Sequence, residues 1–501
     1  MRGVELALAR WGTLSLPQAL APAIAAAEGG IVVDRRLAAS AANARLQVEC
    51  GHGAWDEARR VFRPGADPSG CGRPPAVGET IAQPALARTF RLIAARGSAA
   101  FYDCNDSSGI ARALVAAQRA SRQELGNRGA GRMSCADLAA YRPVVREPLE
   151  ATYRGWLLRV PPPPSSGGLA LIQMLKMLER FPLGDSEAGF ERGSFATLSV
   201  MQEAMRLAFA DRALWMGDTD AVPGLPVAAL IGDRYLARRS ATCPPQDTAA
   251  AVEAYCITPG ARIADVRAGD PLSPPDTDGT AVTAAPSPSG GAGAAEGRET
   301  THFTIVDREG NAVSWTNTIE APWGSGLMVP GFGFLLNNEL TDFNLSPTRH
   351  GNPGEADWNP GANDVAPGKR PRSSMAPVIV FAPGSGKLRP VAAYGSPGGS
   401  TIINTVLGVT LDLIDFRMSV RDAVETPRLS LTSAAEEATT AIEPGFEADV
   451  LQRLRAIGYR IRDPRKISAR FRRWSSIRGR SLADGFADPR RDGRGIGIPA
   501  N

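Results

Sequence analysis

The order of apolar and polar positions along the chain predicts a mixture of helices and strands. Apolar residues recur at helical spacing in the longer segments, whereas shorter runs are rich in β-branched residues. The expected elements are two amphipathic helices within residues 1–30, helices at 194–216 and 400–416, strands at 151–160, 378–381 and 389–394, and further strands from 300 to about 329. Periodicity alone therefore indicates a mixed α/β protein, and the sequence shows no internal repeat.

A β-hairpin is predicted in the second half of the chain. Residues 300–307 and 312–319 have strand-like composition and flank a polar turn that contains glycine. With the turn centred between them, Thr300 lies opposite Thr318 or Ile319. A second hydroxyl group is therefore expected beside that of Thr300.

Residues 270–298, directly before this hairpin, offer almost no large apolar group to bury. Such a composition predicts a disordered segment. A disordered stretch that ends at a hydroxyl residue opening a strand indicates a self-cleavage site, here between Glu299 and Thr300. The alternative for Thr300 and Thr318 is a stabilising cross-strand pair, worth roughly 0.2–1 kcal/mol.

Composition narrows the class of protein. The apolar fraction of 43% is ample for a core, and a net charge of +4 with interspersed basic and acidic residues argues against a nucleic-acid-binding surface. The Arg-rich segment 465–474 is a local exception, either a contact for an acidic partner or a solvated loop. No apolar run approaches the roughly 20 residues of a membrane span, and no signal peptide is recognised at the start.

The six cysteines all precede Thr300 and form no CxxC pair, which argues against a zinc site. We expect neither a metal nor another cofactor. The pairs Cys50/Cys71 and Cys243/Cys256 are close enough in sequence to close loops, as in an oxidising compartment such as the periplasm. Buried free thiols are the alternative.

The segment that begins at Thr300, "TTHFTIVDREGNAVSWTNTIEAPWGSGLMVPGFGFLLNNELTDFN", resembles the γ-glutamyltranspeptidase (glutathione hydrolase) family. Landmarks of the same family occur upstream, among them "PPPPSSGG" and "EAMRLAFADRALWMGD", and downstream, among them "GKRPRSSMAPVIV" and "GSPGGSTIINTVLG". The resemblance therefore covers nearly the whole chain. It implies that the first Thr of the TTH motif becomes the nucleophile once the chain has cut itself before it.

The resemblance also implies a fold. It predicts an α+β protein with the four-layer αββα sandwich of N-terminal nucleophile hydrolases, formed by a large subunit, residues 1–299, and a small subunit, residues 300–501. In the family, a secretion signal and an Arg that binds the substrate α-carboxylate precede the landmark "ALARWGTLSLPQAL". We therefore expect a chain truncated at its start, and a periplasmic or secreted location.

A hydroxyl nucleophile needs a base, which in a Ser-His-Asp hydrolase is an imidazole. His302 shares a strand face with Thr300, and we expect it to support packing or hydrogen bonding instead. After cleavage at Glu299, Thr300 carries its own α-amine, whose pKa of about 8 suits proton abstraction at neutral pH. The resemblance implies that Thr318 hydrogen-bonds the nucleophile, in agreement with the predicted register.

Glycines and polar residues complete the predicted site. Gly398 and Gly399 precede a helix, where backbone N–H groups favour an oxyanion, and the resemblance gives them that role. A γ-glutamyl group carries an α-ammonium and an α-carboxylate, so its pocket needs acids and hydrogen-bond donors. The resemblance places Glu320, Glu339 and Asp342 around the ammonium, and Ser373 and Ser374 on the carboxylate. Without the motifs, the same residues are solvated loop acids and a turn.

These residues predict a self-processing γ-glutamyl hydrolase and transferase, which forms a γ-glutamyl-Thr300 ester from glutathione or a related amide. Water, an amino acid or a peptide then accepts the acyl group. Two alternatives stay open: a cephalosporin or glutaryl-amide acylase of the same fold, and a non-catalytic truncated homologue. The loop 344–368, with Trp358, is expected to cover the nucleophile, and "PPPPSSGG" at 161–168 to form a rigid structural turn.

Overall fold

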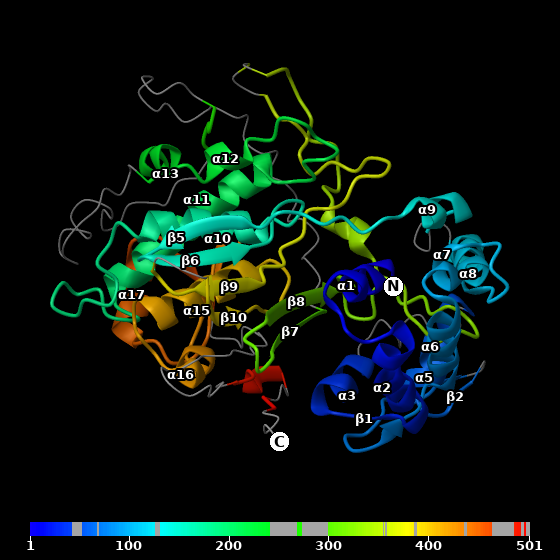
Figure 1. Cartoon of the computed structure of the whole chain (residues 1–501). Coiled ribbons are helices and arrows are strands. Elements are labelled where there is room, and N and C mark those ends of the chain that lie inside the picture. The colour runs from blue at the N-terminus through cyan, green and yellow to red at the C-terminus, as the bar shows by residue number, and fades with distance from the viewer. Residues whose placement is uncertain are drawn as a thin grey trace. The chain divides into compact units, whose positions relative to one another are not determined.

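The computed structural model of the protein contains helices and strands along most of the chain (Figure 1). It describes residues 1–42, 53–67, 70–125, 131–240, 268–272, 299–353, 355, 358–384, 388–434, 438–462, 485–491 and 495–496. The predicted linker, apart from residues 270–272, and the Arg-rich segment 465–474 lie outside the described residues.

The chain forms two compact units. One comprises residues 1–146 and 321–338, and the other comprises residues 147–320 and 339–501. Each unit therefore contains chain from both sides of Thr300. The predicted boundary between a large and a small subunit does not follow the boundary between these units, and it stays a prediction.

The first unit is mainly helical, and its first two helices confirm the two amphipathic helices predicted within residues 1–30. Ser15 begins the second helix with a capping box, in which its side chain and that of Gln18 each bond the other's backbone N–H. The segment 321–338 packs in this unit, where Trp323 Nε1 donates to Ser40 O at 3.0 Å. The elements are α1 (Arg2–Trp11), α2 (Leu16–Gly29), α3 (Arg35–Ala41), α5 (Gly53–Phe62), α6 (Pro84–Arg96), α7 (Ala99–Tyr102), α8 (Ile110–Leu125), α9 (Cys135–Ala140), β1 (Ile31–Val32), β2 (Ala66–Asp67), β3 (Gly70–Cys71) and β4 (Thr80–Ile81).

A disulfide in the first unit joins Cys104, shortly before α8, to Cys135, the first residue of α9. This pair, whose members are 31 residues apart, is not one of the two predicted from the sequence. The alternative of buried free thiols is wrong for Cys104 and Cys135. Cys50, Cys243 and Cys256, on which the two predicted pairs depend, lie outside the described residues.

The second unit is built around a four-stranded sheet with the strand order β10-β9-β6-β5. Strands β5 (Leu149–Tyr153) and β6 (Trp156–Val160) precede the hairpin in sequence, whereas β9 (Val378–Phe381) and β10 (Pro390–Tyr394) follow it. Because β6 pairs antiparallel with β9, the centre of the sheet joins distant parts of the chain. The mixture of helices and mainly antiparallel strands confirms the predicted α+β class.

Two strand predictions are wrong. The segment 151–160 is not one strand, because Arg154 and Gly155 have φ values of 49° and 82° and form the turn of the β5–β6 hairpin. Positive φ at both central residues is typical of a two-residue type I′ turn. The strands predicted from Thr318 to about residue 329 are not formed either. Strand β8 ends at Thr318, and the chain leaves the extended conformation at Glu320, whose φ is 71°.

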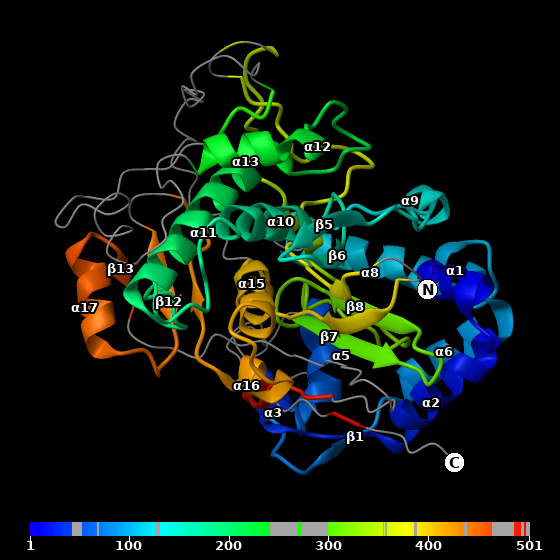
Figure 2. The same cartoon turned by 60° about the vertical axis from the view of Figure 1, so that its left-hand side comes forward.

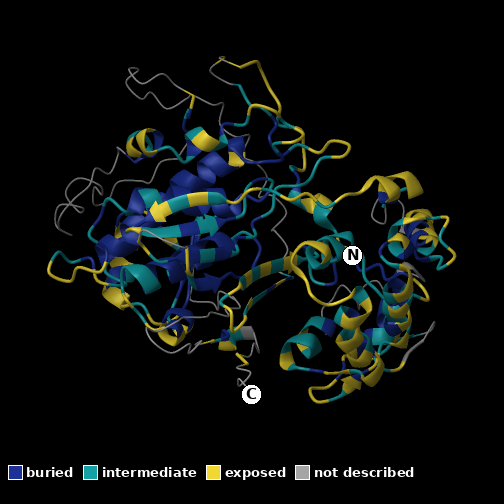
Figure 3. Ribbon diagram, in the orientation of Figure 1, coloured by how far each residue is buried: buried dark blue, intermediate teal, exposed yellow. Residues whose placement is uncertain are grey.

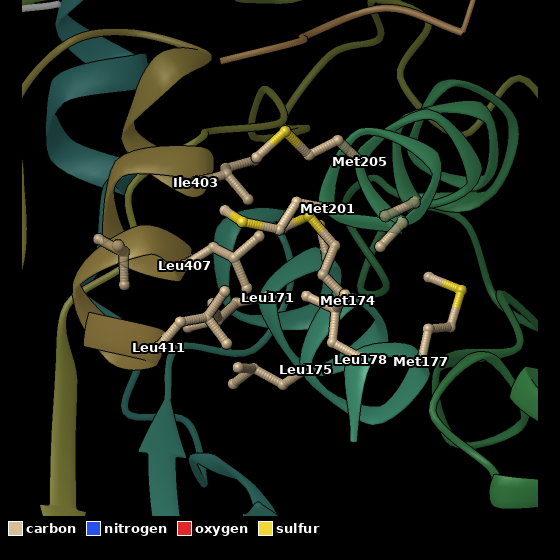
Figure 4. Packing of buried hydrophobic residues seen from close by; sticks show 14 of the residues in the cluster. Leu171, Met174, Leu175, Met177, Leu178, Met201, Met205, Ile403, Leu407 and Leu411 are labelled. Carbon is tan, nitrogen blue, oxygen red and sulfur yellow. The ribbon is translucent and has the colours of Figure 1, made fainter. Parts of the chain in front are cut away.

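Three helices form the buried layer of the second unit. Helix α10 (Gly167–Leu178) packs between α11 (Phe195–Trp215) and α15 (Thr401–Ile414), with Leu, Met and Ile side chains filling the space between them (Figure 4). Nearly every residue of α10 and α11 is buried, and both helices are mostly dark blue in Figure 3. The sequence predicts α11 and α15 correctly, and each has a serine at its N-cap.

The predicted hairpin is confirmed. Strands β7 (Thr300–Val306) and β8 (Ala312–Thr318) form a two-stranded sheet of their own (Figure 2). Thr300 is paired with Thr318, one of the two partners that the turn position predicts. Ser314 Oγ donates to Tyr394 O at 3.1 Å and so joins the hairpin to the end of β10.

The rest of the second unit completes its core around these layers. No helix among the described residues is both long and apolar enough to cross a membrane. The remaining elements are α12 (Val227–Leu230), α13 (Asp233–Arg239), α16 (Val420–Glu425), α17 (Ala448–Ala456), β11 (Leu429–Ser430), β12 (Thr439–Ile442), β13 (Arg460–Ile461), and the 3-10 turns η2 (Glu339–Asp342) and η3 (Pro489–Arg491).

Candidate active site

The hairpin places two hydroxyl groups side by side in a buried position. Thr300 is 6% exposed, and its Oγ1 donates to Thr318 Oγ1 at 3.1 Å. Thr318 Oγ1 also accepts from Glu320 N at 2.9 Å. Because its oxygen receives both of these donors, the hydroxyl of Thr318 holds Thr300 in one orientation at the start of the strand.

The peptide bond before Thr300 is held by the same hairpin. Glu299 O accepts from Thr318 Oγ1 at 3.3 Å and from Ile319 N at 3.4 Å. Both distances are at the long end of the hydrogen-bond range, yet both donors converge on the carbonyl of the predicted cleavage site. Negative charge that develops on this oxygen therefore meets two donors.

His302 lies two residues after Thr300 on the same face of β7 and is 3% exposed. Its Nδ1 is 2.9 Å from Thr316 Oγ1, and its Nε2 is 3.1 Å from Thr304 Oγ1. Burial lowers the pKa of the imidazole to about 3, so the ring is neutral near neutral pH. These contacts fit the predicted role in packing and hydrogen bonding, and they make His302 a poor candidate for a base.

The paired glycines lie in the buried turn between β10 and α15. Gly398 and Gly399 have backbone φ values of 139° and 61°, which residues other than glycine rarely adopt. The turn begins at Gly395, where an added Cβ would lie 2.5 Å from the ring of His302. The turn thus packs directly on the β7 face that also carries Thr300. The oxyanion role of the glycines stays a prediction.

The three predicted acids come together where the chain leaves and re-enters the second unit. Glu320 is buried after β8, and Glu339 and Asp342 are the first and last residues of η2. Burial, and then the negative charge of Glu320, raise the pKa of Glu339 to about 7, against the effect of a hydrogen bond with Asp342. The segment between them closes on itself, because Ala321 N donates to Asn338 Oδ1 at 2.9 Å. This cluster of carboxyl groups suits a bound cation such as an ammonium group.

One buried side chain connects the segment of the acids to the segment of the serine pair. Asn363, which is 1% exposed, donates from Nδ2 to Asp342 O at 2.8 Å and accepts at Oδ1 from Arg372 N at 2.9 Å. Arg372 directly precedes Ser373 and Ser374. One amide group therefore fixes the backbone beside the acids and the backbone beside the serines.

The loop expected to cover the nucleophile is partly packed into the second unit. Trp358 makes an edge-to-face contact with Trp215, with ring centroids 5.5 Å apart. His350 and Asn359 pair across the loop through hydrogen bonds of 3.0 and 2.8 Å. Its role as a cover stays a prediction.

The described residues thus bring most of the predicted site into one region. Hydrogen bonds connect Thr300, Thr318 and Glu320, the charge of Glu320 acts on Glu339, and Glu339 hydrogen-bonds Asp342. Asn363 was missed, because a buried asparagine in a polar loop has no periodic signal. Thr316 was missed as a partner of His302, although its even spacing from Thr318 puts both on one strand face. Among the described residues, no group of three or more His, Cys, Asp or Glu is arranged to hold a metal ion.

Comparison with known proteins places these features in a family. A family model described as γ-glutamyltranspeptidase matches residues 1–498. The glutathione hydrolase proenzyme of Bacillus subtilis (strain 168) is 34% identical over 499 residues, which cover 99% of this chain and 74% of that protein. The acylase ACY 1 proenzyme of Pseudomonas sp. (strain SE83) is 33% identical over 467 residues, 93% of this chain and 68% of that protein.

A solved structure has the same fold. The crystal structure of cephalosporin acylase from Bacillus halodurans matches 99% of this chain and 77% of its own, with a TM-score of 0.75 and 24% sequence identity. At this identity the match concerns the fold alone. It agrees with the α+β architecture predicted above.

Proposed function

Because the chain belongs to the γ-glutamyltranspeptidase family, we propose that it cuts its own Glu299–Thr300 bond and then uses Thr300 to hydrolyse or transfer γ-glutamyl groups. The single observation that carries the proposal is the hydrogen bond from Thr300 Oγ1 to Thr318 Oγ1 at the start of the hairpin. The names of the relatives add support, since the one from Bacillus subtilis is a glutathione hydrolase and a proenzyme.

Self-cleavage begins with attack of Thr300 Oγ1 on the carbonyl carbon of Glu299. The hydroxyl loses its proton as the new C–O bond forms, the C–N bond breaks, and Thr300 N gains a proton to become an amine. Water then hydrolyses the ester and leaves a carboxylate on Glu299. Thr318 Oγ1 and Ile319 N, which contact Glu299 O in the uncut chain, stabilise the negative charge of the intermediate.

The cleaved enzyme carries its base on the nucleophile itself. The α-amine of Thr300, with a pKa of about 8, takes the proton of Oγ1 as this oxygen attacks the γ-carbonyl of the donor. The proton passes to the leaving amine, and water or an amino acid then attacks the γ-glutamyl ester. We assign the oxyanion to the N–H groups of Gly398 and Gly399, because they lie just before α15 and the helix dipole favours negative charge there.

Donor recognition follows the charges of the site. We assign the α-ammonium of the γ-glutamyl group to Glu320, Glu339 and Asp342, whose carboxyl groups lie together. We assign the α-carboxylate to the hydroxyl groups of Ser373 and Ser374. Glutathione and related γ-glutamyl amides present both groups, and the acceptor is water, an amino acid or a peptide.

A cephalosporin or glutaryl-amide acylase is the second candidate function, and the acylase among the relatives favours it. A glutaryl group has the carboxylate of a γ-glutamyl group but no ammonium. In that case the donor would bring no ammonium group to the carboxyl groups of Glu320, Glu339 and Asp342, where the charge of Glu320 acts on Glu339. The acids therefore favour the γ-glutamyl donor.

We place the protein in the periplasm or outside the cell. The Cys104–Cys135 disulfide supports this location, because disulfides persist in oxidising compartments.

The test is intact-mass analysis of the purified protein together with release of nitroaniline from L-γ-glutamyl-p-nitroanilide. We expect the wild type to yield two fragments that separate between Glu299 and Thr300, and to release nitroaniline. Thr300→Ala stays uncut and inactive, whereas the control Thr301→Ala, at an exposed neighbouring position, is cut and active.

Other outcomes of this test separate the alternatives. Glutaryl-p-nitroanilide is tested in parallel. Cleavage of the chain with release of nitroaniline from this glutaryl substrate alone would favour the acylase. A wild type that stays uncut and inactive would contradict the proposal and leave the non-catalytic homologue.

A further inference from the structure

The serine pair assigned to the substrate carboxylate packs against the start of α10. Ser165 forms a parallel bridge with Ser373, and Ser373 O accepts from Ser166 N at 2.8 Å and from Ser166 Oγ at 2.7 Å. An added Cβ at Gly167 would lie 2.4 Å from Met375 O. The "PPPPSSGG" segment therefore fits tightly against the backbone of the serine loop, which goes beyond the plain structural turn predicted for it.

A buried cation lies directly behind these serines. Arg212, near the end of α11, is 6% exposed. Its Nε donates to Ser166 Oγ at 2.8 Å, and its Nη2 donates to Ser374 Oγ at 2.7 Å. Its backbone is fixed to the same loop, because Arg372 Nη1 donates to Arg212 O at 2.6 Å. Arg212 thus contacts both segments that meet at the serine pair.

The contact with Ser374 has a chemical consequence. A hydroxyl oxygen that accepts from a guanidinium group turns its own O–H away from that group, so it acts as a donor on its other side. The positive charge also polarises the hydroxyl, and hydrogen bonds to ionised groups are the stronger ones. Arg212 is buried, so water screens its charge less than at the surface. A carboxylate on the serine pair would therefore sit one hydroxyl group away from a fixed positive charge.

We propose that Arg212 is a positioning residue for the carboxylate half of the γ-glutamyl site, acting through Ser374 and Ser166. The inference rests on the proposed function, because it takes the serine pair as the carboxylate subsite. The role of Arg212 applies to any acyl donor with a carboxylate at the far end of the acyl chain, which includes both γ-glutamyl and glutaryl amides. A donor that keeps the ammonium but lacks this carboxylate gains nothing from Arg212.

The experiment separates the two ends of the donor. KM and kcat are measured with L-γ-glutamyl-p-nitroanilide, and two colourless anilides serve as competing ligands. Glutaryl anilide keeps the carboxylate without the ammonium, and 4-aminobutanoyl anilide keeps the ammonium without the carboxylate. The variants are Arg212→Gln, Arg212→Lys and Ser166→Ala, each checked for fold by circular dichroism and for self-cleavage by intact mass.

We expect Arg212→Gln to raise KM, and the inhibition constant of glutaryl anilide, by about tenfold, which corresponds to about 1.4 kcal/mol. The inhibition constant of 4-aminobutanoyl anilide and kcat should stay within about twofold. Arg212→Lys keeps the charge but loses one of the two contacts, so its KM should lie between those of the wild type and Arg212→Gln. Ser166→Ala removes one acceptor of Arg212 and should raise KM less than Arg212→Gln does.

Arg192→Gln is the matched control. Like Arg212, Arg192 donates two hydrogen bonds in the second unit, to Asp412 Oδ1 at 2.6 Å and to Pro427 O at 2.7 Å. Neither of these two acceptors belongs to a residue of the proposed site. Equal weakening of both anilides by Arg212→Gln, or a loss confined to kcat, would overturn the inference and leave the proposed function intact. A cleaved wild type with no activity on the γ-glutamyl anilide would overturn the proposed function and the inference together.

Discussion

At the scale of single residues, the carboxyl group of Glu339 changes charge near neutral pH, as the α-amine that cleavage gives Thr300 does somewhat higher. Burial and the negative charge of Glu320 raise the pKa of Glu339 to about 7. Below that pH the group is protonated in the folded protein, and above it the group is ionised. An α-ammonium bound beside it is therefore attracted more strongly on the alkaline side.

We expect the KM for L-γ-glutamyl-p-nitroanilide to fall as the pH rises from about 6 to about 8, because Glu339 loses its proton over this range. Glu339→Gln cannot ionise, so its KM should be higher at the alkaline end and nearly flat. The control is Glu309→Gln, in the exposed hairpin turn, which should follow the wild type. The same fall in KM in Glu339→Gln would show that another group titrates.

The raised pKa also has a consequence for stability. The folded state holds the Glu339 proton up to about pH 7, whereas the unfolded chain releases it near the ordinary glutamate pKa of 4.5. The folded state therefore binds more protons between these values, and its stability falls as the pH rises through this window. The difference in unfolding free energy between Glu339→Gln and the wild type should accordingly shift in favour of the variant from about pH 5 to about pH 8.

At the scale of elements, the glycine turn that begins at Gly395 and strand β7 are in direct contact through His302. An added Cβ at Gly395 would lie 2.5 Å from the imidazole, which Thr304 and Thr316 hold in place. Gly408, in the middle of α15, has no atom within 4 Å of the same added group. Gly395 lies in the turn before α15 and Gly408 lies inside α15. The two glycines are therefore close in sequence but differ in the space around them, so they form a matched pair.

We expect Gly395→Ala to lower the free energy of unfolding by about 1–3 kcal/mol, as overpacking does. Gly408→Ala should raise it by about 0.5–1 kcal/mol, because alanine is the better residue inside a helix. The measurement is urea unfolding in the uncut Thr300→Ala background, where a single chain unfolds. Equal effects of the same sign would mean that the ring of His302 moves freely.

The same scale applies to Asn363, which joins η2 to the serine loop. Asn363→Ala leaves Asp342 O and Arg372 N without this amide partner, so we expect a loss of about 1–3 kcal/mol in unfolding free energy. KM for the γ-glutamyl anilide should also rise, since the two halves of the donor site lose their common support. Asn352→Ala, in the exposed part of the same loop, should change neither quantity, and a change in stability without a change in KM would limit Asn363 to a structural role.

Elements also show where sequence reasoning succeeds and where it stops. The register of Thr300 and Thr318 was predictable because a turn and two β-rich runs fix it locally. The Arg154–Gly155 turn carried its own glycine signal, which the surrounding apolar run obscured. The contact between Asn363 and Arg372, and that between Arg212 and Ser374, depend on tertiary packing and have no local pattern. The glycine and acid roles came from family motifs rather than from periodicity.

At the scale of the whole molecule, the chain on either side of Thr300 is shared by both compact units. In the second unit, β6 pairs with β9 across the predicted cut, and α10 packs between α11 and α15. In the first unit, the segment 321–338 packs with helices from the start of the chain, as the bond between Trp323 and Ser40 shows. A cut before Thr300 therefore leaves two fragments that share a sheet and two apolar cores.

We expect the cleaved fragments to co-elute in equal amounts in native size-exclusion chromatography, because obligate interfaces of this apolar kind resemble a divided core. They should separate only in denaturant, where their summed mass equals the 52.8 kDa chain plus one water. Thr300→Ala, which cannot be cut, gives one chain under both conditions. Fragments that separate without denaturant would mean that the shared sheet does not hold the cleaved protein together, and the site residues on both sides of the cut would then lose their common frame.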